Sequence, residues 1–85
     1  MKTIIETLND AKKVLNGLDL EQAKLACGCR KHWACAIIDD NKHLDIRVFF
    51  DDNLCIFLSY AIKDNNKLSY ECALLLSGDD TWQLD

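Results

Sequence analysis

The first part of the chain has apolar residues spaced as on one face of a helix. They recur at steps of four and three residues, with polar side chains between them, and are Ile4, Leu8, Ala11, Leu15 and Leu18. Thr3 followed by Glu6 fits a capping box, and Gly17 suits the left-handed residue that follows a helix. The pattern predicts a first helix that ends just before Gly17.

A second, shorter helix is indicated directly afterwards. Asp19 is a favourable N-cap, with Gln22 three residues later, and the segment continues through Ala23, Leu25 and Ala26 toward Gly28. Residues 1–30 are therefore expected to form the helical part of the molecule.

From residue 33 onward the period changes from that of a helix to that of strands. Residues 43–50 have apolar side chains at every even position, and the same parity continues through 54–62 and 68–76. Segments 33–38 and 54–62 are apolar on both parities, which predicts that these two strands are the most buried. Residues 67–76 also fit a helix capped by Gly78, but we favour a strand.

Short turns rich in Asp and Asn separate these segments, so neighbouring strands are expected to be antiparallel. The predicted fold is α+β, with one or two N-terminal helices packed on one face of a four- to five-stranded antiparallel meander. A chain of 85 residues has room for a single domain, residues 1–85, in which 31–85 form the sheet. Its longest apolar runs are far too short to span a bilayer, which predicts no membrane contact.

The two faces of the predicted sheet differ in character. The even positions would form the core beneath the helices, whereas the opposite face mixes polar and apolar side chains. Exposed apolar patches of a few hundred Å² often mark interaction surfaces. The sequence therefore predicts a protein-binding sheet face, or a homodimer interface, that includes Arg47, Phe49, Phe57, Ala61, Ala73 and Leu75.

The formal net charge of −4 is unevenly distributed along the chain. Residues 1–33 hold six Lys or Arg against four Asp or Glu, whereas residues 34–85 hold four against ten. Most of this acid lies in turns, at Asp39, Asp40, Asp51, Asp52, Asp79 and Asp80. Alternate turns of a meander lie at the same end of the sheet, so acidic clusters are expected there. They would attract a protein with a basic surface, and direct binding to nucleic acid is not expected.

Three cysteines and a histidine lie within nine residues. These residues, Cys27, Cys29, His32 and Cys35, are of the types that bind zinc. Their spacing matches no common zinc motif closely, and a strand from residue 33 would direct Cys35 away from the loop. Free, partly buried cysteines are the favoured interpretation, and zinc is the alternative. An odd count of five cysteines without an apolar leader favours a reducing, cytoplasmic compartment.

The sequence contains no glycine-rich phosphate loop and no G-x-S-x-G nucleophile element. A reactive thiol at Cys29 or Cys35 is disfavoured. The C-x-C pair at the helix end would close a small, strained disulfide ring, and the helix dipole there has the wrong sign to stabilise a thiolate. We therefore expect no enzyme and no cofactor. The expected function is that of a small acidic intracellular protein-binding module of the inhibitor, immunity or regulatory type, with a small zinc-binding domain as the alternative.

Overall fold

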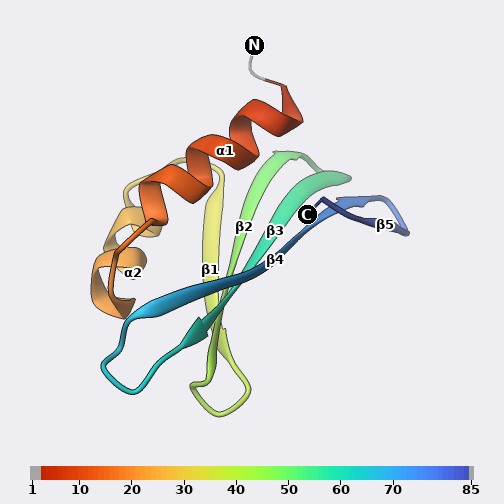
Figure 1. The fold of residues 1–85 in the computed structure, drawn as a ribbon. Helices are drawn as coiled ribbons and strands as arrows, with labels where there is room; N and C mark the ends of the chain where they lie inside the picture. Colours follow the sequence, from red (N-terminus) through yellow and green to blue (C-terminus); the bar gives the residue numbers. More distant parts are fainter. Residues whose placement is uncertain (1–2, 85) are drawn as a thin grey trace.

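The computed structural model describes residues 3–84, which form two helices followed by a five-stranded antiparallel sheet (Figure 1). The predicted α+β arrangement, with its helices at the N-terminus, is confirmed. The elements are α1 (Ile4–Leu15), α2 (Leu20–Gly28), β1 (Trp33–Ile38), β2 (His43–Asp51), β3 (Leu54–Ile62), β4 (Leu68–Ser77) and β5 (Asp80–Gln83).

Both helices begin with a capping box, as predicted. The backbone N–H of Glu6 donates to the Thr3 hydroxyl, and the N–H of Thr3 donates to the Glu6 carboxylate. Asp19 and Gln22 exchange the same two hydrogen bonds at the start of α2. These side chains satisfy backbone donors that have no partner inside the helix. Gly17 follows α1 with a φ of 76°, in the left-handed conformation that glycine adopts without strain.

The strands follow one another in chain order across the sheet, β1-β2-β3-β4-β5. The helices pack against one face only, which we call the inner face (Figure 1). The core lies between that face and the helices. Its completely buried side chains include Ala11 and Ala23 from the helices and Leu44, Ile46, Ile56 and Leu58 from the sheet.

The position of β1 corrects one expectation. Its sequence is apolar on both faces, which predicted a deeply buried strand, yet all its residues from Ala34 to Ile38 are exposed. The reason is topological, because β1 forms an edge of the sheet and β2 is its one neighbouring strand among the described residues. Strand β3, predicted to be equally buried, is central and contributes Ile56, Leu58 and Tyr60 to the core.

A β-bulge in β4 corrects a second expectation. Tyr60 pairs with Tyr70 but Ser59 pairs with Cys72, so the register passes over Glu71. Because side chains alternate between the two faces along a strand, one extra residue moves every later side chain of the strand to the opposite face. Ala73 and Leu75, expected on the uncovered face, therefore contribute to the core instead. Cys72, Leu74 and Leu76, expected in the core, lie on the uncovered face.

No helix within residues 3–84 combines the length and the apolar character that crossing a membrane requires.

Candidate functional site

The sheet face that no helix covers is the candidate site, and we call it the outer face. Antiparallel pairing arranges its side chains in four rows across the strands. In order along β2, the rows are Ile38-His43-Ala61-Ser69, Ala36-Asp45-Ser59-Cys72, Ala34-Arg47-Phe57-Leu74 and Phe49-Cys55-Leu76.

The outer face is largely apolar and partly accessible. Ile38 is 39% exposed and Phe49 is 40% exposed, while Phe57, Leu74 and Leu76 are half-buried. Four of the six residues predicted for this surface, Arg47, Phe49, Phe57 and Ala61, do lie on it. Leu74 and Leu76 take the places expected for Ala73 and Leu75.

An open hollow of about 280 Å³ lies on the outer face over β1, β2 and β3. Its lining includes Ala34 and Ala36, whose small side chains leave room, and the rings of Phe49 and Phe57. Asp45 also contributes to the lining, although it is only 9% exposed. Sequence reasoning missed this hollow, because it depends on which small and large side chains become neighbours across the strands.

Two opposite charges lie side by side in this hollow without pairing. The hydroxyl of Ser59 donates a hydrogen bond of 3.2 Å to Asp45 Oδ1. The guanidinium of Arg47 lies 5.1 Å from the centre of the Phe57 ring, at cation–π distance. Within residues 3–84, no ion pair joins Asp45 and Arg47. Arg47 is therefore exposed to an opposite charge brought by a partner, whereas Asp45 is nearly buried and hydrogen-bonded to Ser59.

His43 lies between two carboxylates. Its Nδ1 lies 3.1 Å from Asp39 Oδ2 and its Nε2 lies 3.0 Å from Glu71 Oε1. Glu71 is the bulge residue of β4, and it reaches across Ala61 on β3 to contact the ring. The bulge thus adds a carboxylate to the row of the outer face that contains His43.

The strand-to-strand turns at the two ends of the sheet differ in charge, although the α2–β1 connection, with Arg30 and Lys31, reaches the end that contains Asp51. The turns after β2 and β4 lie side by side, because the N–H of Gly78 donates a 2.8 Å hydrogen bond to the carbonyl of Asn53. They form what we call the acidic end, with Asp51, Asp52, Asp79 and Asp80.

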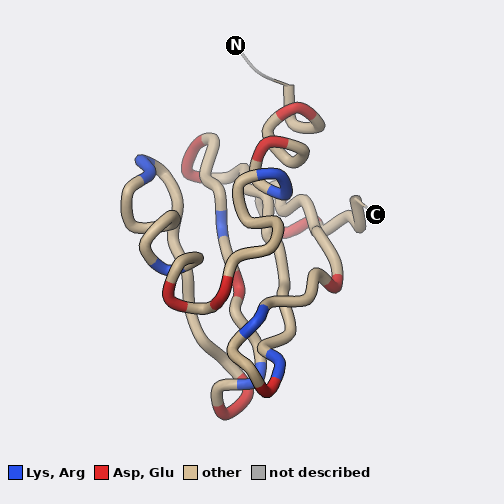
Figure 2. The backbone as a smooth tube through the Cα atoms, turned by 60° about the vertical axis from the view of Figure 1, so that its left-hand side comes forward, with Lys and Arg blue, Asp and Glu red and all other residues tan. Residues whose placement is uncertain are grey.

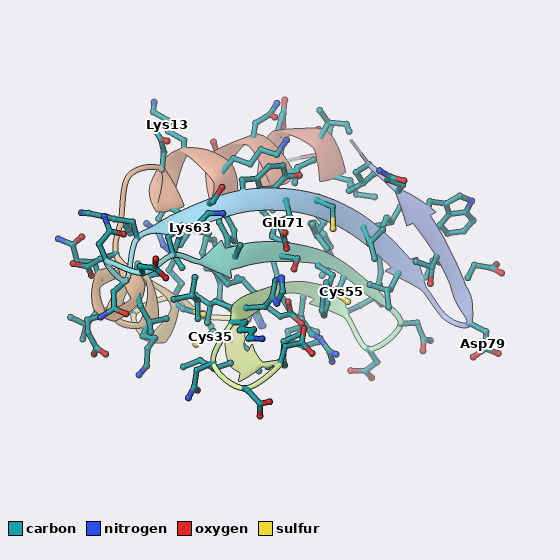
Figure 3. The ribbon with its side chains drawn as sticks, turned by 60° about the horizontal axis from the view of Figure 1, so that its bottom comes forward. Lys13, Cys35, Cys55, Lys63, Glu71 and Asp79 are labelled. Carbon is teal, nitrogen blue, oxygen red and sulfur yellow. The ribbon has the colours of Figure 1, made fainter. Side chains whose placement is uncertain are left out.

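At the opposite end of the sheet, the charges of the turns sum to zero. The N–H of Ile62 donates to the carbonyl of Lys42, which links the turns after β1 and β3. This neutral end has three acids, Asp39, Asp40 and Asp64, and three bases, Lys42, Lys63 and Lys67. Lys63 and Asp79 lie at opposite sides of the molecule in Figure 3, and blue and red segments alternate at the lower end in Figure 2.

The structure does not bring the four candidate zinc ligands together. Cys27 is buried in α2, and Cys35 lies beside it on the inner face of β1. Burial, followed by this neighbouring thiol, raises the pKa of Cys27 to about 12. Cys29 and His32 are exposed. No group of three His, Cys, Asp or Glu side chains suited to a metal ion occurs in the described part of the chain.

Comparisons of the chain with models of protein families, with curated proteins and with solved structures find no match.

Proposed function

We propose that this chain is a protein-binding module that acts by non-covalent contact through its outer face. The observation that carries the proposal is the row of half-exposed apolar side chains, Phe57 and Leu74 among them, on a sheet face that no helix covers. Placing such side chains in contact with a partner removes apolar surface from water, which is the dominant favourable contribution to most protein association.

The acidic end would favour a partner with a basic surface. Four carboxylates in two adjacent turns would accelerate the approach of a basic surface and would repel nucleic acid. A small acidic module of this kind suits an inhibitor, immunity or regulatory role inside the cytoplasm, exerted by contact rather than by catalysis.

Replacement of one outer-face aromatic residue tests this function. Phe57→Asp introduces a charge into the apolar face and should abolish capture of partners by the immobilised protein. Leu25→Asp is the matched control, because Leu25 is 70% exposed on α2, far from the outer face in the fold. Equal capture by both variants and the unmodified protein would contradict the proposal.

A second comparison tests the acidic end. Replacing Asp51, Asp52, Asp79 and Asp80 by Asn should slow capture at low salt and have little effect at high salt, where exposed charges are screened. An unchanged association rate at low salt would show that these carboxylates do not guide binding.

A further inference from the structure

We infer that the partner that covers the outer face is a second copy of this chain, packed face to face with its strands antiparallel to those of the first. This inference rests on the proposed function and names the occupant of the same surface. Three features support it: the positions of Asp45 and Arg47, the sizes of the outer-face side chains, and the charges at the two ends of the sheet. A twofold axis that crosses the strands near Ile46 places each of these features opposite its complement in the second copy.

The first feature is the position of Asp45 and Arg47. They lie in adjacent rows on β2, one on each side of Ile46, and they do not pair within the chain. A twofold axis at Ile46 places Asp45 of each copy opposite Arg47 of the other. Because an isologous interface makes each contact twice, two equivalent ion pairs then form inside the hollow. Pairing also compensates a carboxylate that is already nine-tenths buried.

The second feature is the size of the side chains. On β3 and β4, the central row nearer the acidic end contains Phe57 and Leu74, and the row beyond it contains Cys55 and Leu76. The facing row nearer the neutral end contains the small side chains Ser59 and Cys72, while in the outermost row Glu71 crosses Ala61 to contact His43. Antiparallel stacking places the row with Phe57 and Leu74 of one copy over the row with small side chains of the other, which fills space as interdigitated sheets do. Parallel stacking would instead oppose large side chains to each other.

The third feature is the difference in charge between the turns at the two ends. Parallel stacking would place one acidic end over the other, with four Asp in the turns of each copy. Antiparallel stacking places each acidic end over a neutral end, near Lys42, Lys63 and Lys67 of the second copy. Like charges in close opposition are unfavourable, so the charges favour the same arrangement as the sizes do.

The available area is sufficient for a specific but modest dimer. Strands of six, nine, nine, ten and four residues, with about 3.3 Å per residue and about 4.8 Å between strands, give a face of roughly 600 Å² per copy. Specific interfaces bury about 800 Å² on each partner, and the smallest stable ones about 600 Å². Because the outer face lies at the lower end of this range, the dimer should dissociate on dilution.

The decisive experiment exchanges charges between copies. Asp45→Arg alone and Arg47→Asp alone should each weaken self-association at least tenfold, because like charges would then face each other twice. An equimolar mixture of the two variants should recover a dimer, since every new charge meets its opposite across the interface. Sedimentation equilibrium of the unmodified chain should give twice 9.7 kDa at high concentration. Recovery in the mixture supports the reciprocal pairing, and its absence from two folded variants overturns it.

A measurement on the unmodified protein keeps the inference testable if Asp45→Arg fails to fold. The thiols of Cys55 and Cys72 lie on the outer face, whereas Cys29 lies at the exposed end of α2. Maleimide labelling of Cys55 and Cys72 should slow as the protein concentration rises, while that of Cys29 stays constant. Equal rates at all concentrations would overturn the inference.

The inference and the proposed function can fail separately. If the chain is a monomer at every concentration and Phe57→Asp still abolishes capture of another protein, the second copy is wrong and the binding function stands. If Phe57→Asp changes neither self-association nor capture, both are wrong.

Discussion

Ala73 of β4 lies directly opposite Leu58 of β3, and both side chains are completely inaccessible to solvent. The next residue, Leu74, lies opposite Phe57 on the outer face. This assignment of faces is a consequence of the bulge at Glu71, because a regular ladder would exchange the two positions. The bulge therefore determines which apolar residues of β4 stabilise the fold and which are available to a partner.

Substitutions at these two adjacent positions should have opposite consequences. Ala73→Asp places a carboxylate in the core without a partner and should lower the free energy of unfolding by about 3–5 kcal/mol. Leu74→Asp should cost about 1 kcal/mol, and it should weaken self-association. Urea denaturation of both variants at low protein concentration measures the first difference. Equal destabilisation would mean that the register shift is wrong.

The bulge could not be predicted from the sequence for a specific physical reason. Residues 73–76 are apolar at all four positions, so either register buries apolar side chains. The alternation before the bulge, at Leu68 and Tyr70, predicted the wrong continuation. The burial of β1 was wrongly predicted for a related reason. A strand that is apolar at both odd and even positions can lie at an uncovered edge of a sheet as well as in its centre.

The helices and the order of the strands were predictable because their signals are local. Capping boxes at Thr3 and Asp19 and the alternation in β2 depend on residues close in sequence. The candidate site depends on residues that meet only across strands. The hollow at Asp45, the contact of His43 with Glu71 and the lysines of the neutral end all result from the register and turn positions.

Alkaline pH should destabilise the fold through two buried groups. Burial raises the pKa of Tyr60 from 10.0 to about 12, and that of Cys27 from 9.0 to about 12. Above about pH 9 the unfolded chain loses these protons while the folded chain retains them, so the free energy of unfolding falls as pH rises toward 12. Cys27→Ala and Tyr60→Phe should each make this fall shallower, as measured by denaturation at several pH values. Leu25→Ala, at an exposed position without a titratable side chain, is the control and should leave the pH dependence unchanged.

The thiol of Cys27 should react more slowly with alkylating reagents than that of Cys29. Cys27 is only 2% exposed and its raised pKa leaves almost no thiolate at neutral pH, whereas Cys29 is exposed. Mass spectrometry of protein treated briefly with iodoacetamide should find Cys29 modified at least about tenfold faster than Cys27. Comparable rates in the folded state would contradict the burial of Cys27, and the difference should disappear in denaturant.

A glycine in the turn between β1 and β2 should stabilise the protein. Asp39, Asp40 and Asn41 have φ values of 54°, 55° and 68°, three consecutive left-handed residues in which the Cβ approaches a carbonyl oxygen. Asp40→Gly removes one Cβ and should raise the free energy of unfolding by up to about 1 kcal/mol, despite the added entropy of the unfolded chain. Asp64→Gly is the matched control in the turn between β3 and β4, where the φ is not positive. There, glycine only adds freedom to the unfolded chain and should lower stability by about 0.5–1 kcal/mol. Thermal denaturation of the two variants should therefore shift the midpoint in opposite directions, and a shift in the same direction would contradict the left-handed turn.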